Sequence, residues 1–152
     1  MSRKGLTIIS AAILFLVLNL ERGEGLPGVV VVVNSQNPLS GITAKELRDI
    51  YYGKKTAWTD GSEIEVVDLQ AERKERQEFS QIVFNIDPAA VEKNYMKLVF
   101  TGQGRPPQQV MPTPQKVLSF IAYNRSAIGY VDEADITDPA LREKIKIIPI
   151  KS

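Results

Sequence analysis

Five consecutive valines, residues 29–33, place the strongest constraint on how this chain folds. Their β-branched side chains favour extended backbone. A strand without alternating polar residues has no face to turn toward water, so both of its faces must be covered. We therefore expect a strand over 29–33 that is buried between layers of other elements.

Signals for a helix and a second strand follow directly. Thr43 and Glu46 form a capping box, in which each side chain accepts a hydrogen bond from the backbone N–H of the other residue. Gly53 is expected to end this helix in the left-handed conformation. Asp60 and Gly61 are a turn signal, and the run that follows predicts a strand over 64–69.

The same alternation continues toward the C-terminus. Asp-Pro and Thr-Pro pairs predict helix starts, because the first side chain caps the helix and proline fits its first turn. The predicted elements are a helix over 72–84, helices starting at 87–88, 113–114 and 138–139, a loop over 101–112, and strands over 127–131 and 146–150. Strands that alternate with helices favour an α/β fold with a mainly parallel sheet.

Several further residues are predicted to be structural. Apolar side chains at helical spacing are expected to face the core; these are Phe79, Ile82, Val83, Val91, Tyr95, Leu98 and Val99. Trp58 is expected to pack against the sheet edge, and Gly129 to allow a close approach in a strand. The acidic residues of 132–138 lack the spacing of a calcium loop, so we expect them to act as caps and turn residues.

The N-terminus carries an export signal. Arg3 and Lys4 precede an apolar run over 6–20, which at about fifteen residues is short for a membrane span but suits a secretory signal. We expect cleavage before Leu26, which leaves one domain over 26–152 in the periplasm or outside the cell. The alternative is an uncleaved N-terminal anchor. Cleavage would leave no segment for stable membrane insertion.

Composition excludes several classes of function. The chain has no cysteine and no histidine. Disulfides, thiolate or imidazole metal sites and Ser-His or Cys-His catalytic pairs are therefore excluded. Residues 1–25 carry one more basic than acidic group, so the remaining chain is neutral, which argues against a nucleic-acid partner. We expect no catalytic residue, no metal and no cofactor.

A set of short motifs carries a family resemblance. The motifs are, in order, Val33-Asn34, Leu47-Arg48-Asp49-Ile50-Tyr51, Gly53-Lys54-Lys55, Trp58 and Ala127-Ile128-Gly129-Tyr130-Val131. Together they resemble the second lobe of the PstS-type periplasmic phosphate-binding proteins, which serve phosphate ABC transporters. The resemblance covers roughly 29–150. It implies a single lobe of the type II periplasmic-binding-protein fold, with a mainly parallel sheet flanked by helices, and a role in phosphate or oxyanion uptake.

The resemblance also places a candidate ligand site. In the family, an arginine at a strand end and a Ser-Gly-Thr at the next helix start hold the phosphate. Here the arginine falls on Leu69 and the Ser-Gly-Thr on 73–75, so none of the four is kept. If an anion binds, we expect the backbone N–H groups of 70–73 (Gln70, Ala71, Glu72 and Arg73) to hold it, with Arg73 as the charged partner. The alternative is that 72–76 is a solvated, salt-bridged helix face.

Two other places complete the candidate set. Asn34 and Ser35 follow the first strand, and Arg105 lies in the glycine-rich loop 101–112, where it could hold a phosphate or carboxylate. The alternative for the loop is a connection stiffened by proline.

The sequence leaves open which partners the protein has. The family's first lobe has no counterpart in these residues, so a second chain could complete the cleft. A competing class is a periplasmic adaptor or sensor that kept the lobe fold and lost its ligand.

Overall fold

The computed structural model describes residues 28–152. The predicted signal segment and its cleavage site before Leu26 lie outside the described residues. Within 28–152, no helix has the length and apolar character that crossing a membrane requires.

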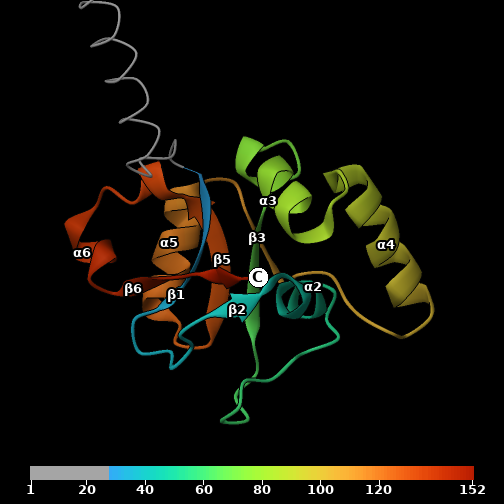
Figure 1. The fold of residues 1–152 in the computed structure, drawn as a ribbon, viewed down its shortest axis with the longest axis horizontal. Coiled ribbons are helices and arrows are strands. Elements are labelled where there is room, and N and C mark those ends of the chain that lie inside the picture. Colours follow the sequence, from blue (N-terminus) through green and yellow to red (C-terminus); the bar gives the residue numbers. More distant parts are fainter. Residues whose placement is uncertain (1–27) are drawn as a thin grey trace, which may run out of the picture.

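Helices and strands alternate in the described part of the chain, as the sequence predicts (Figure 1). The strands are β1 (Val29–Asn34), β2 (Ile42–Thr43), β3 (Glu65–Leu69), β4 (Gln109–Met111), β5 (Ala127–Asp132), β6 (Ile145–Ile148) and β7 (Ile150–Lys151). The α-helices are α2 (Ala44–Tyr51), α3 (Lys74–Phe84), α4 (Pro88–Phe100), α5 (Pro114–Tyr123) and α6 (Pro139–Arg142), and a 3₁₀ turn, η1, spans Glu133–Asp135.

A five-stranded sheet in the order β4-β3-β5-β1-β6 forms the centre of the fold. Strand β3 runs parallel to β4 and β5, whereas β1 runs antiparallel to both of its neighbours, β5 and β6. Four of the five strands therefore point the same way and β1 points the other way. This confirms the prediction of a mainly parallel sheet. Strands β2 and β7 form a separate parallel pair.

Helices cover both faces of the sheet, and successive residues of β5 show which helix covers which face. Gly129 faces Val117 and Ile121 of α5. The next residue, Tyr130, contacts Phe79 of α3 and lies near Tyr51 of α2. Helix α4 packs against α3 at the side of the molecule (Figure 1). The layered α/β architecture predicted from the alternation of strands and helices is therefore confirmed.

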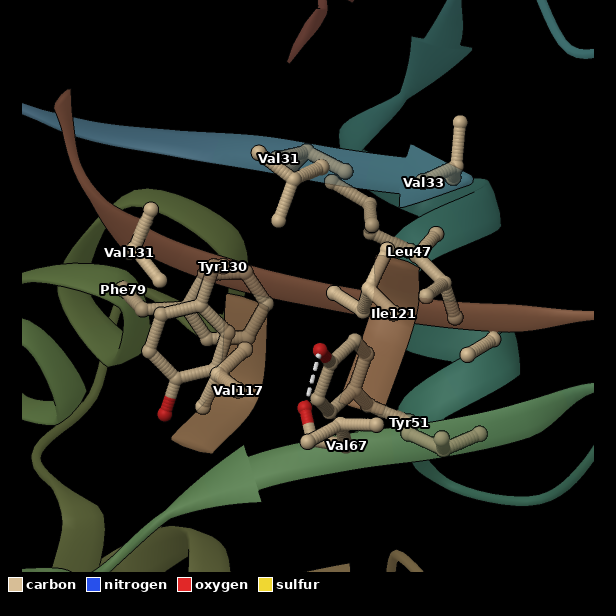
Figure 2. Close-up of a cluster of buried hydrophobic side chains, with 14 of the residues drawn as sticks. Val31, Val33, Leu47, Tyr51, Val67, Phe79, Val117, Ile121, Tyr130 and Val131 are labelled. Carbon is tan, nitrogen blue, oxygen red and sulfur yellow. Dashed lines mark hydrogen bonds between the residues drawn. The ribbon is translucent and has the colours of Figure 1, made fainter. Parts of the chain in front are cut away.

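The core on the α2 and α3 side is aromatic. Phe79 stacks on Tyr130 with ring centres 3.8 Å apart and planes 4° apart. The ring centre of Tyr51 lies 4.8 Å from that of Phe79. The Tyr51 hydroxyl donates a 2.9 Å hydrogen bond to the carbonyl of Val67 (Figure 2). The central valines, 31–33, are fully buried beside this cluster, as a strand covered on both faces requires.

Most local signals are confirmed in detail. Both hydrogen bonds of the Thr43–Glu46 capping box are present, and Gly53 has a φ of 70° just after the helix. The caps predicted before proline are also present; they are Asp87, Thr113 and Asp138. Two residues of the acidic run, Asp132 and Asp138, cap η1 and α6. Trp58 is partly buried against the core and donates to the Ser126 carbonyl.

Some predictions are wrong. The strand expected over 146–150 is two strands, β6 and β7, separated by Pro149, because proline lacks the N–H that the ladder needs. The loop expected over 101–112 contains β4. Ile82 and Val99 were expected to face the core, but they are 47% and 56% exposed.

Gly129 gives a testable measure of how closely α5 packs on the sheet. A Cβ at this position would lie 2.9 Å from Ile121 Cδ1 and 3.0 Å from Val117 Cγ1. Because overpacking a filled core forces side chains off their rotamers, Gly129→Ala should destabilise the protein by about 1–3 kcal/mol in urea unfolding. Ile121→Val removes the methyl nearest to the new Cβ. It should therefore destabilise the Gly129→Ala variant less than it destabilises the wild type. Unchanged stability of Gly129→Ala would refute this packing.

Candidate functional site

The predicted site lies where β3 ends and α3 begins. Leu69 is the last residue of β3, and a turn over 70–73 leads into the helix. The backbone N–H of Gln70 donates to the Met111 carbonyl at 3.1 Å, and that of Arg73 donates to the Gln70 carbonyl at 3.0 Å. The turn is thus held by its own backbone, and two of the four predicted N–H groups already have protein acceptors.

Arg73 is engaged with a buried carboxylate. Its Nε and Nη2 donate to the two carboxylate oxygens of Glu75 at 3.1 Å and 2.9 Å. The Glu75 side chain is 1% exposed, and this hydrogen-bonded pair raises the pKa of Arg73. A two-pronged contact of this kind is the geometry with which arginine grips an oxyanion. An anion at this place would have to share or displace Glu75.

Other charges around the helix start are mostly acidic. Lys74 reaches toward Asp132 at 3.5 Å. Partial burial, followed by the nearby charges of Glu75 and Asp132, raises the pKa of Asp135. The helix dipole and the first N–H groups of α3 favour an anion here, because the N-cap residue Arg73 makes no side-chain hydrogen bond to them. The described residues contain no group of three or more acidic side chains placed to hold a metal ion.

Behind this surface lies a buried polar network that joins β3 to α3. Arg76 Nε lies 3.0 Å from Asp68 Oδ1 in an ion pair, and both side chains are almost completely buried. The Tyr130 hydroxyl donates to the same Asp68 oxygen, and Arg76 Nη1 donates to the Ser80 hydroxyl. Burial raises the pKa of Asp68, while Arg76 and Tyr130 act in the opposite direction.

This network corrects the interpretation of 72–76 as a solvated helix face. Glu72 and Lys74 are exposed, but Glu75 and Arg76 are each 1% exposed. The physical reason is that α3 is covered on two sides, by the sheet and by α4. The signal that could have revealed the network is Asp68, a carboxylate that stands between the apolar residues Val67 and Leu69 of the strand, because a buried charge needs a partner.

Asn34 and Ser35 lie at the opposite end of the sheet. Strand β1 is antiparallel to β5, so β1 ends where β5 begins. The Asn34 side chain donates to the carbonyls of Ile121 and Ala122, each at 3.0 Å, and accepts from the Gln36 N–H. Asn34 therefore joins the end of β1 to the end of α5 and is fully engaged there.

Arg105 lies in a third place, before the start of β3. Its Nη2 pairs with Glu63 Oε1 at 2.7 Å, and its backbone N–H donates to the Tyr52 carbonyl at 3.0 Å. Gly53 packs directly against Arg105. The loop 101–108 is thus tied to the end of α2, and the candidate residues fall into three separate groups.

Comparison with known proteins gives no match to a family model and no match to a curated protein. Solved structures do match. An ABC-type phosphate transport receptor from Vibrio cholerae has a TM-score of 0.60 and 21% identity, over 80% of this chain and 45% of its own. A protein described as a phosphate ABC transporter substrate-binding protein with bound phosphate, from Clostridium perfringens, has a TM-score of 0.62 and 20% identity, over 81% and 44%. PstS from Borrelia burgdorferi has a TM-score of 0.59 and 14% identity, over 82% and 47%.

The chain has the fold of part of a phosphate-transport substrate-binding protein. It spans less than half the length of each of these structures. The predicted single-lobe resemblance to PstS-type proteins is therefore confirmed at the level of the fold.

Proposed function

We propose that the protein is an exported, non-catalytic solute-binding-like domain that acts in phosphate or oxyanion uptake by an ABC transporter. The observation that carries this proposal is the fold shared with structures described as phosphate-transport proteins. The start of α3, which follows β3 after the turn over 70–73, supports the same function because its first N–H groups have no side-chain cap within 28–152 and lie at the positive end of the helix dipole.

In this proposal the anion lies against the turn over 70–73 and the first turn of α3. The N–H groups of Ala71 and Glu72 donate to it together with those at the start of the helix. Arg73 supplies the charge and shares its guanidinium with Glu75, which lowers the affinity. A single lobe leaves such a site open to water, so a second protein chain would supply the opposite wall.

A thermal-shift titration with inorganic phosphate tests the proposal. A ligand at 100 times its Kd stabilises a protein by about 2.7 kcal/mol. We expect a phosphate-dependent rise in Tm that Arg73→Ala abolishes and that Lys97→Ala, an exposed charge on α4, leaves unchanged. Glu75→Gln should increase the rise, because it releases Arg73 and removes a negative charge. The proposal is wrong if millimolar phosphate produces no shift, or if Arg73→Ala keeps the shift intact.

A second candidate is a periplasmic protein–protein adaptor. Helix α4 favours it, because Met96, Val99 and Phe100 are exposed, and Phe100 is 93% exposed. Apolar side chains gathered on one helix face are a common feature of protein-binding surfaces. The occupation of Arg73 by Glu75 also fits an adaptor that has lost its ligand. An adaptor of this kind predicts no phosphate-dependent shift, so the same titration separates the two functions.

A further inference from the structure

A hollow of about 330 Å³ lies where β1 ends, at the end of the sheet away from the start of α3. Its lining comes from the exit of β1, the end of α5 and the segment before β6. The lining residues are Asn34, Ser35, Gln36, Ala122, Tyr123, Arg125 and Lys144. We propose that this hollow binds a phosphate monoester that carries a flat ring, such as a nucleoside monophosphate. This site is independent of the proposed uptake function, which uses the other end of the sheet.

The charge of the hollow is positive. Arg125 and Lys144 are its two charged lining residues, and no carboxylate lines it. Neither cation takes part in the ion pairs formed within 28–152, whereas Arg73, Arg76 and Arg105 all do. Asp60 is an acidic group close enough for the charge of Arg125 to act on it. Hydrogen bonds from Ser62 are the main cause of its lowered pKa, and Arg125 is a smaller one.

The backbone that carries the two cations is held in place by the β1 exit. The Ser35 N–H donates to the Lys144 carbonyl at 2.9 Å, and Asn37 Nδ2 donates to the Arg125 carbonyl at 3.3 Å. Asn34 fixes the end of α5 from the same side. The positions from which both cations extend are thus set before a ligand arrives, which reduces the ordering cost of binding.

Tyr123 indicates that the ligand has a ring. Its side chain is 69% exposed, and Lys144 Nζ lies 3.1 Å from its hydroxyl and 4.4 Å from its ring centre. Tyr123 also lines an adjoining hollow of about 280 Å³ that includes Met111 and Phe120. Aromatic rings pair well with other rings in such a setting.

The size of the hollow leads to the same conclusion. Since a water molecule takes up about 30 Å³ of the liquid, a bare phosphate would leave much of the hollow to solvent. We place the phosphate between Arg125 and Lys144 and the ring along Tyr123, toward Phe120.

Isothermal titration calorimetry of the purified protein with AMP tests this site. In the Arg73→Ala variant, which removes the phosphate site proposed at the start of α3, we expect AMP to bind at least about tenfold more tightly than adenosine or inorganic phosphate, because each of those supplies only half of the contacts. The double variant Arg125→Ala/Lys144→Ala should weaken AMP binding by about tenfold or more. Both residues are exposed, so the variant should fold. The matched control Lys54→Ala/Lys97→Ala removes two cations that line a different hollow and should bind AMP as the wild type does.

Variants at Tyr123 and Arg73 complete the test. Tyr123→Phe should keep most of the AMP affinity and Tyr123→Leu should lose it, because the ring is the element that matters. Arg73→Ala should leave AMP binding unchanged, so failure of this site and failure of the uptake site are distinguishable. The inference is overturned if millimolar AMP gives no binding, if the Arg125/Lys144 double variant binds AMP normally, or if the control weakens binding equally.

Discussion

Asp68→Ala is expected to destabilise the protein by about 3–5 kcal/mol, because it leaves the Arg76 charge buried without its partner. Arg76 is 1% exposed and its Nε lies 3.0 Å from Asp68 Oδ1. The Tyr130 hydroxyl would lose its acceptor in the same step. The loss should appear as a lower midpoint in urea unfolding followed by circular dichroism.

Two comparisons separate a buried pair from an ordinary ion pair. Lys45→Ala breaks the exposed pair with Asp49, whose atoms lie 2.7 Å apart, and should cost less than about 1 kcal/mol. The double variant Asp68→Leu/Arg76→Met removes both charges and should be more stable than Asp68→Ala alone. If Asp68→Ala costs no more than Lys45→Ala, the Asp68–Arg76 pair does not hold α3 to the sheet.

The second large effect is expected at Phe79. Its ring is fully buried and stacks on Tyr130, with Tyr51 on another side. Phe79→Ala should destabilise the protein by about 3–5 kcal/mol, since it removes the buried surface and leaves a cavity between α3 and the sheet. Phe100→Ala is the matched control, because the same side chain at 93% exposure packs against little and should cost nearly nothing. Equal stabilities of the two variants in thermal unfolding would contradict the described core.

Much of the fold follows from local rules in the sequence. The Thr43–Glu46 box, the Asp-Pro and Thr-Pro starts and Gly53 act within one helix turn, so their geometry does not depend on distant residues. The burial of β1 follows from the valine run itself, because a strand segment with no polar residues must be covered on both faces. The predicted burial of Ile82 and Val99 was wrong because burial depends on residues that are distant in the sequence. Helical spacing does not reveal how much of a helix its neighbours cover, and α4 packs mainly on α3.

The candidate site was harder to predict, because its state depends on pairing across elements. The charged run 72–76 has the spacing of a solvated face, yet Arg76 turns inward to meet Asp68 of β3. Arg73 was correctly placed at the helix start, but its engagement with Glu75 is a choice among several nearby charges that spacing alone does not make. The Arg125–Lys144 hollow combines three distant segments, and no local motif marks such a site.

The central proposal is that an oxyanion binds at the start of α3. The most direct measurement is a titration of the ¹⁵N-labelled protein with inorganic phosphate, followed by the backbone amide shifts of the whole chain. We predict saturating shifts for the amides of 70–76, which Arg73→Ala removes. Amides of 70–76 that stay unmoved at saturating phosphate, or shifts confined to the far end of the sheet around 34–36, would contradict the claim.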